Sequence, residues 1–218
     1  MTFSILARDP SRNEMGCAAA TGNLAVGGWV LRAEPGAGLV ATQGVAVSSL
    51  WGDAALRMLL AGDPAQSIVD KLVRQDAGAD YRQLLVLDAS GATAAWTGGG
   101  NHDVKRHVLE DNLVVGGNWL ANDRVLPALK SSFLESTGSM AERLLMALEF
   151  ATQMGSDSRG TESAALRVVS PHLPLLDLRI DSSTSPVKDL ISLYHKTLAP
   201  EYGDFLSRLP TREDPYKY

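Results

Sequence analysis

The chain has 218 residues, of which 45% are hydrophobic and 21% charged, a balance typical of a folded globular protein. Its net charge of −5, with no run of basic residues, argues against a nucleic-acid partner, because binding to phosphates needs a clustered cationic surface. The single cysteine, Cys17, excludes an intrachain disulfide, and no stretch approaches the roughly 20 apolar residues of a membrane helix, so we expect a cytoplasmic protein without a membrane partner.

The first part of the chain is predicted to be mainly β-structure. Alternation over 2–8, a polar turn and a small apolar stretch at 15–21 predict a hairpin. After a glycine-rich loop, the near-continuous apolar run at 38–46 is typical of a strand covered on both faces. Two helices are then expected, one over 51–61 and a second with Asp63 as its N-cap.

Strands and helices follow in blocks over the rest of the chain. Strands are predicted at 82–88, 92–97, 112–118, 163–169 and 175–181, with a polar loop before the third of them. Helices are predicted at 121–134, at 140–154 behind a Ser139 and Glu142 capping box, and after Ser185 and Pro186.

This block order differs from strict β-α-β alternation, so we predict an α+β fold with two antiparallel sheets covered by helices. Residues 1–198 are expected to form one domain. The tail, 199–218, is aromatic and shows no clear periodicity, and we expect it to pack on the domain or on a second subunit. A homodimer is therefore the expected assembly.

Thr2 is the candidate nucleophile. Removal of Met1, which is efficient before a small residue, would leave a hydroxyl and a free α-amine together on Thr2. An α-amine titrates near pH ~8, so a neutral fraction exists at neutral pH to accept the hydroxyl proton during attack. Threonine also suits the first position of a strand, so Thr2 alone does not separate a catalytic role from a structural one.

Polar residues interrupt two of the apolar strands. Thr42 and Gln43 lie within the run at 38–46, and Gly117 and Asn118 end the strand at 112–118. Gly117 would let backbone approach a ligand, and Asn118 offers a side-chain N–H to a developing oxyanion. The alternative is a glycine turn in which Asn118 caps the next helix.

A dense polar loop precedes the strand at 163–169 and supplies Arg159, Glu162 and Ser163. Arg159 could hold a substrate carboxylate through a two-pronged contact. The alternative is an internal ion pair between Arg159 and Asp157 or Glu162.

A metal site would have to use His102, Asp103 and His107, because imidazole and carboxylate are usual zinc or iron ligands. Their spacing matches no short metal motif, and surface histidines on a polar loop are the simpler interpretation. We expect no metal and no other cofactor. Cys17, which lies among alanines, is interpreted as a small buried residue.

Several segments together resemble one protein family. They are Met-Thr-Phe-Ser-Ile at the start, AVGG with GLVATQG, YRQLLVLDASG, GGNWLA, GSDSRGTESAAL and DLRID. They resemble the bacterial and archaeal DUF1028 family, which is placed in the N-terminal nucleophile (Ntn) hydrolase superfamily, and they occur in the same order from Thr2 to about Leu198. The resemblance implies a four-layer αββα fold and a nucleophile at the position of Thr2.

The family is similar at Thr42 and Gln43, at His107, at Gly117 and Asn118, at Arg159 and at Ser163. This chain departs from it at Gly116 and Glu162, where the family commonly has glutamine. The cysteine-and-tryptophan segment that usually precedes the family histidine is replaced here by residues 101–106. These differences indicate a changed pocket.

We therefore expect an Ntn-type amidohydrolase that cleaves a small amide, imine or related C–N bond. Thr2 would attack, and Asn118 would stabilise the oxyanion. Substrate contacts are expected from Gln43, Arg159, Thr42, Gly117, Glu162, Ser163 and His107. The alternatives are a non-catalytic small-molecule binding protein on the same scaffold and a metal-dependent hydrolase built on His102, Asp103 and His107.

Overall fold

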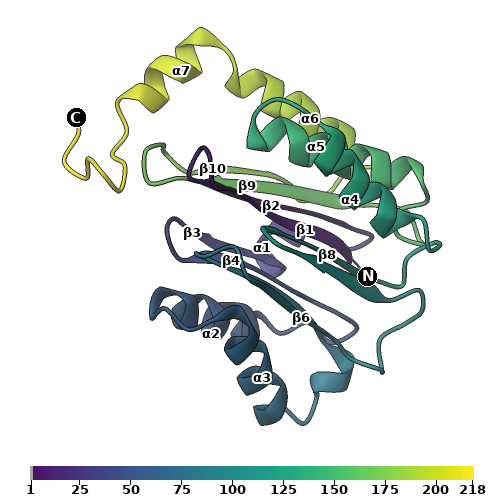
Figure 1. The fold of residues 1–218 in the computed structure, drawn as a ribbon. Helices are drawn as coiled ribbons and strands as arrows, with labels where there is room; N and C mark the ends of the chain where they lie inside the picture. Colours follow the sequence, from purple (N-terminus) through teal and green to yellow (C-terminus); the bar gives the residue numbers. More distant parts are fainter. Residues whose placement is uncertain (1) are drawn as a thin grey trace.

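Two antiparallel sheets face each other between layers of helices in the computed structural model, which describes residues 2–218 (Figure 1). In spatial order, the larger sheet contains β10 (Leu176–Ile180), β9 (Ser163–Val169), β2 (Glu14–Thr21), β1 (Thr2–Asp9), β8 (Leu113–Asn118) and β7 (Arg106–Glu110). The smaller sheet contains β3 (Leu31–Glu34), β4 (Gly38–Gln43), β5 (Gln83–Asp88) and β6 (Thr93–Thr97). The predicted α+β class with a four-layer αββα arrangement is confirmed.

Helices cover the outer face of each sheet. The larger sheet carries α4 (Val125–Glu135), α5 (Met140–Gln153) and α6 (Pro186–Thr197), and the smaller one carries α2 (Ser49–Leu60) and α3 (Ala65–Gln75) (Figure 1). Three short helices complete the described chain: α1 (Val26–Trp29), the 3₁₀ turn η1 (Ala79–Tyr81) and α7 (Pro200–Ser207). No helix within residues 2–218 is long and apolar enough to cross a membrane.

Strand β1 lies inside the larger sheet with both of its faces covered. Successive side chains of a strand point to opposite faces. Phe3 and Ile5 therefore pack into the core beneath α4, α5 and α6, whereas Leu6 packs between the two sheets against Leu85 and Leu87 of β5. The same alternation sends the side chain of Thr2 into the layer between the sheets.

Five short elements were not predicted from the sequence, the 3₁₀ turn η1 among them. The expected glycine-rich loop contains α1 and β3, and the expected polar loop contains β7, an edge strand whose residues are half-buried or exposed. Helix α7 has eight residues and buries none of them. These elements are too short or too exposed to carry the long apolar pattern from which the others were recognised.

Several predicted boundaries were wrong. Strand β4 ends at Gln43, because Gly44 has a φ of +123° and its backbone lies close to the carbonyl of Tyr81. The N-cap of α3 is Pro64 rather than Asp63, and α4 begins at Val125 rather than at 121. The capping box of Ser139 and Glu142 at α5 is confirmed.

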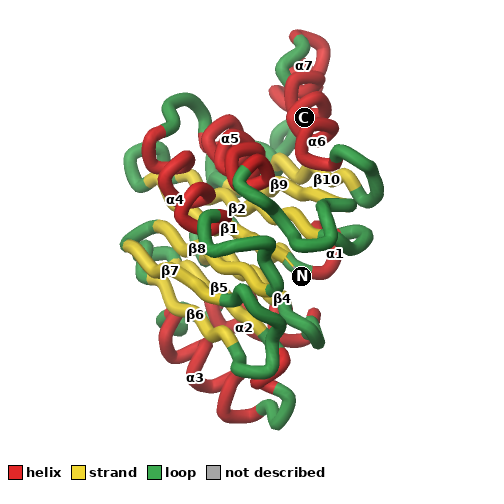
Figure 2. Tube along the Cα trace, turned by 90° about the vertical axis from the view of Figure 1, so that its right-hand side faces the viewer, coloured by secondary structure: helices red, strands yellow, loops and turns green. Residues whose placement is uncertain are grey.

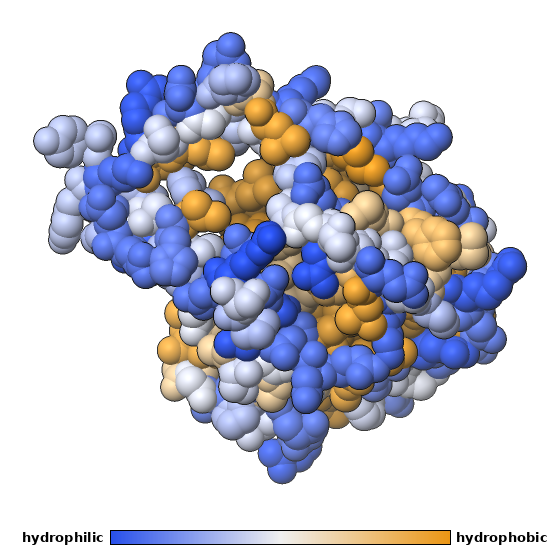
Figure 3. Space-filling model, turned by 45° about the horizontal axis from the view of Figure 1, so that its top comes forward, coloured by the Kyte–Doolittle hydropathy of each residue, from blue (hydrophilic) through white to orange (hydrophobic). Residues whose placement is uncertain are grey.

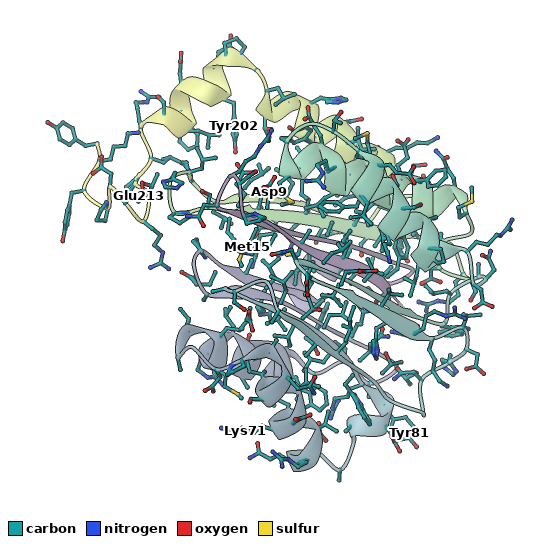
Figure 4. The ribbon with its side chains drawn as sticks, viewed as in Figure 1. Asp9, Met15, Lys71, Tyr81, Tyr202 and Glu213 are labelled. Carbon is teal, nitrogen blue, oxygen red and sulfur yellow. The ribbon has the colours of Figure 1, made fainter. Side chains whose placement is uncertain are left out.

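The C-terminal tail lies at the end of the sandwich away from the start of β1. Figure 4 shows Glu213 at that far end, beyond Asp9, the last residue of β1. Glu213 bonds through its backbone N–H to the carbonyl of Pro171, and its carboxylate contacts His172 at 2.5 Å. A cavity of about 460 Å³ lies between α6, α7 and the β9–β10 loop, with apolar side chains visible in the hollow (Figure 3).

Candidate functional site

A cluster of buried polar side chains lies at one end of the layer between the sheets. We call it the polar cluster; its members are Thr2, Ser4, Thr21, Gln43, Gln83 and Asn118. Figure 2 looks toward this end of the sandwich, where loops surround the strand ends. The rest of the layer is apolar, and buried polar groups need hydrogen-bond partners, so the cluster must satisfy itself from within.

Gln83, the first residue of β5, is at the centre of the polar cluster. Its Nε2, which carries two hydrogens, lies within hydrogen-bonding distance of three acceptors: Thr97 Oγ1 at 2.8 Å and the backbone carbonyls of Gly117 at 3.0 Å and Arg106 at 3.1 Å. Its Oε1 accepts from Gln43 Nε2 at 2.7 Å and from Asn118 Nδ2 at 3.1 Å. Gln83 thus connects β5 of one sheet to β8 of the other.

Gln43 ties the smaller sheet to β1. Its Oε1 accepts a hydrogen bond from Ser4 Oγ at 2.6 Å, and its Nε2 also lies 3.3 Å from the carbonyl oxygen of Thr2. The backbone at the start of β1 is therefore fixed from the opposite sheet as well as by its neighbours β2 and β8.

Thr2 is the first residue of β1 and pairs with Thr21 on one side and with Asn118 on the other. Its hydroxyl donates to Thr21 Oγ1 at 3.2 Å, and only 6% of the residue is exposed. The side-chain amides of Asn118 and Gln43 belong to residues that neighbour Thr2, and the rest of the layer between the sheets is apolar. Such an arrangement suits a nucleophile whose developing charge is stabilised by fixed dipoles.

Asn118 has one unsatisfied atom. The residue is 1% exposed, and its Oδ1 has no hydrogen-bond partner among the described residues, although its Nδ2 is bonded to Gln83. Asn118 does not cap α4, whose N-cap is Arg124, so the predicted alternative of a capping role was wrong.

Gly116 and Gly117 are strand residues of β8 rather than parts of a turn. A Cβ on Gly116 would lie 2.6 Å from Leu85 Cδ2 in the facing sheet, and one on Gly117 would lie 2.9 Å from Leu120 Cδ2 on the helix side. These glycines let β8 approach both neighbouring layers. Gly117 enters the polar cluster through its carbonyl oxygen, which accepts from Gln83.

His107 of β7 extends the cluster toward the sheet edge. Its Nδ1 lies 2.8 Å from Thr97 Oγ1, and that hydroxyl also accepts from Gln83 Nε2. Burial lowers the pKa of His107 below its usual range, which favours the neutral imidazole.

The loop before β9 is held by Asp157, whose side chain is fully buried. Asp157 accepts from the backbone N–H groups of Gly22 at 2.7 Å and of Arg159 at 2.8 Å. The Arg159 guanidinium pairs with the Asp157 carboxylate at 3.3 Å and lies 4.8 Å from the Trp119 ring. Arg159 is thus engaged in the internal ion pair that was the predicted alternative to substrate binding.

The remaining expected site residues are dispersed. Ser163 Oγ donates to the carbonyl of Asn23 at 2.6 Å, so it fixes the loop after β2. Glu162 is exposed, and its backbone N–H donates to the carbonyl of Thr21. Thr42 faces α2, where its hydroxyl donates to the carbonyl of Ser48, and it lies outside the polar cluster.

The three expected metal ligands do not come together. His102 stacks on Trp119 with ring centroids 4.2 Å apart, Asp103 pairs with Lys105 at 3.1 Å, and His107 bonds to Thr97. Residues 2–218 contain no group of three His, Cys, Asp or Glu side chains placed to hold a metal ion. The structure therefore does not support the metal-dependent alternative.

The sequence did not identify several residues of this region, namely Ser4, Thr21, Gln83 and Thr97. Ser4, Thr21 and Gln83 occupy inward positions of buried strands, and a polar residue in such a position was the available signal. Cys17 is buried, as expected, and burial raises the pKa of its thiol to about 12.

Comparison with known proteins finds a matching family model and a similar solved structure. The model of a family described as "Family of unknown function (DUF1028)" matches residues 2–190. A crystal structure of a Silicibacter pomeroyi protein assigned to that family is similar, with a TM-score of 0.93 and 40% identity, covering 99% of this chain and 98% of that one. No curated protein matches the chain.

Two further solved structures are only weakly similar. Eukaryotic HslV from Trypanosoma brucei has a TM-score of 0.44 and 15% identity, covering 77% of this chain and 99% of that one. Anbu (ancestral beta-subunit) from Yersinia bercovieri has a TM-score of 0.41 and 13% identity, covering 95% of this chain and 98% of that one.

Proposed function

The chain belongs to the DUF1028 family, and on that premise we propose that it is an amidohydrolase of the Ntn type. Its substrate would be a small molecule with an amide, imine or related C–N bond, and Thr2 would be its nucleophile. One observation carries the proposal: Thr2 begins a central strand and directs its hydroxyl into a buried polar cluster.

In this mechanism, Met1 is first removed; Met1 itself lies outside the described residues. With an amide substrate, the neutral α-amine of Thr2 then accepts the hydroxyl proton as Oγ1 attacks the amide carbonyl carbon. The second N–H of the Asn118 amide, which Gln83 does not use, would stabilise the oxyanion. Protonation of the leaving amine gives an acyl-enzyme, and water hydrolyses this ester to release the acid and restore Thr2.

The other expected site residues take supporting roles in the proposal. Gln43 and the Gly117 carbonyl hold the ends of β1 and β8 through Gln83. Arg159 is paired with Asp157 but keeps 35% of its side chain exposed, and this exposed part would meet a substrate carboxylate at the loop surface. Ser163 and Glu162 hold the loops beside it, and His107 supports the cluster through Thr97.

The decisive experiment combines mass spectrometry with covalent trapping. Untagged protein should show loss of Met1, and a β-lactone should then add one acyl group that peptide mapping places on Thr2. The Thr2→Ala variant should not be acylated at its N-terminal peptide. A panel of N-acyl amino acids, short peptides, lactams and cyclic imines would identify the substrate. Retention of Met1 in the native host would contradict the mechanism and favour the non-catalytic binding protein.

We propose further that the protein acts as a cytoplasmic homodimer formed through its C-terminal tail, 199–218. Phe205, Tyr216 and Tyr218 of this tail are exposed, and α7 buries none of its residues. Exposed aromatic side chains of this kind are enriched at protein interfaces. Light scattering of the full chain should give twice the monomer mass, and Phe205→Ser should shift the mass toward the monomer. A monomeric wild-type protein at micromolar concentration would contradict the dimer.

A further inference from the structure

The unsatisfied atom of Asn118 is a second functional feature of the site. A buried polar atom without a partner costs about 1 to 3 kcal/mol, so native proteins rarely leave one unless something else binds there. Asn118 Oδ1 is such an atom, in a residue that is only 1% exposed.

The orientation of the Asn118 amide follows from its neighbours. Gln83 must turn its Nε2 toward the backbone carbonyls of Gly117 and Arg106, because a carbonyl can only accept a hydrogen bond. Gln83 Oε1 then faces Asn118, which must present Nδ2 to it. Exchanging the oxygen and nitrogen of Asn118 would place two acceptors against each other. Asn118 therefore directs its oxygen away from Gln83 as a free acceptor.

The start of β1 pairs directly with Asn118. Asn118 and Thr2 are cross-strand partners, and their side chains share the face between the sheets. Directly opposed residues have Cβ atoms about 4.5 to 5.5 Å apart, which is within the reach of an asparagine amide. An amine on Thr2 would supply the donor that Oδ1 lacks.

We propose that Asn118 Oδ1 accepts a hydrogen bond from the α-amine of Thr2, which makes Asn118 the positioning residue for the catalytic base. The inference rests on the proposed function, since Thr2 has a free amine only after Met1 is removed. The bond would hold the amine at one side of the hydroxyl and select the direction of proton transfer. One amide would then serve both partners, with its oxygen on the amine and an N–H toward the oxyanion.

The proposed bond predicts the direction in which substitution of Asn118 should change the pKa of the Thr2 α-amine. Burial disfavours a charged ammonium, whereas an acceptor or a negative charge beside it favours the charged form. Asn118→Asp keeps the acceptor and adds a charge, so the pKa of the Thr2 α-amine should rise by about one pH unit or more. Asn118→Leu removes the acceptor at nearly constant volume, so the same pKa should fall.

The test uses full-length protein released from a fusion by a protease that cleaves directly before Thr2, so that the amine exists whatever happens to Met1 in the cell. Threonine labelled with ¹³C reports the amine titration by NMR, and the Thr2→Ser variant assigns the signal. Asn112→Asp is the matched control, because Asn112 precedes β8 at its opposite end and bonds to Arg8 instead.

Opposite changes in pKa for Asn118→Asp and Asn118→Leu, with no change for Asn112→Asp, would support the inference. Equal changes in the pKa of the Thr2 α-amine for Asn118→Asp and Asn112→Asp would overturn the inference. Changes in that pKa of the same sign for Asn118→Asp and Asn118→Leu would also overturn it. If Asn118→Leu does not fold, the difference between the two aspartate variants decides alone. Failure of Met1 removal or of turnover in the native protein would instead count against the proposed function, which this titration does not measure.

Discussion

Thr2 and Asn118 are paired residues of neighbouring antiparallel strands, at the position where the pairing of β1 and β8 ends. Their side chains therefore share one face, with the Gln83 amide fixing Asn118 from the opposite sheet. A hydroxyl and an oriented amide are thus placed together by main-chain pairing rather than by a flexible loop. Substitutions at this pair should change chemistry without changing the fold.

Thr2→Ala should abolish hydrolysis and covalent trapping, because the attacking atom is removed and no acyl-enzyme can form. The loss of one buried hydrogen bond to Thr21 should lower the free energy of unfolding by only about 1 kcal/mol. Thr2→Ser keeps the hydroxyl and the amine and should retain partial activity, since only the methyl that restricts the rotamer is lost. Turnover and urea unfolding of the three proteins check this. Wild-type turnover in Thr2→Ala would show that Thr2 is an ordinary strand residue.

Gln83→Leu should lower the free energy of unfolding by about 2 to 4 kcal/mol, because it leaves buried donors and acceptors on both sheets without partners. Gln43 Nε2, Asn118 Nδ2 and the carbonyl of Gly117 all lose their bond to Gln83. The matched control is Gln66→Leu on α3, where the glutamine is exposed and a change below about 0.5 kcal/mol is expected. Urea denaturation measures both. Equal stability of the two variants would mean that the polar cluster does not join the sheets.

Gly116→Ala should destabilise the protein by about 1 to 3 kcal/mol, because the new methyl would lie 2.6 Å from Leu85 Cδ2. Combining it with Leu85→Ala should cost less than the sum of the single changes, since the smaller side chain removes the clash. Gly99→Ala, which has open space around the added methyl, is the control. Additive losses in the double variant would show that the two sheets can move apart at this point.

The free energy of unfolding should fall as the pH is lowered through the range below about 6.5, the ordinary pKa of histidine. Burial lowers the pKa of His107 in the folded protein, so the unfolded chain binds a proton at higher pH than the folded one. The loss of stability is absent above this pH range, and it grows as the pH falls toward the pKa that His107 has in the folded protein. His107→Gln should flatten the dependence, whereas His195→Gln, at an exposed position of α6, should preserve it. Urea unfolding at pH 7.5 and 5.5 measures the difference.

The fold was largely predictable, because most of its elements carry an apolar pattern. The continuous run over β4 and the alternation over β1 both reflect burial by the facing sheet or by helices. Strand β7 was missed because its five residues are half-buried or exposed, and helix α7 because it has only eight residues and buries none of them. Where a predicted boundary was wrong, as at the end of β4, local turn geometry such as the positive φ of Gly44 sets the true end of the element.

The site was predicted in part. Thr2, Gln43 and Asn118 were identified as polar residues at strand ends, and the structure brings them together. Gln83 was missed because its role depends on a partner in the other sheet, and the sequence does not show which strands face each other. Thr42 was expected beside Gln43, yet a strand sends adjacent side chains to opposite faces, so only one of the two can enter the cluster.

The pairing of β1 with β8 joins segments that are synthesised far apart in time. Thr2 is 6% exposed in the fold, so a Thr2 α-amine would be largely enclosed once β8 has closed over this end of β1. Translation adds about 5 to 20 residues per second, so reaching Asn118 takes roughly 6 to 24 s. During this interval β1 lacks one of its two neighbours. The long separation between the two strands thus provides a window in which the nucleophile could be unmasked before folding encloses it.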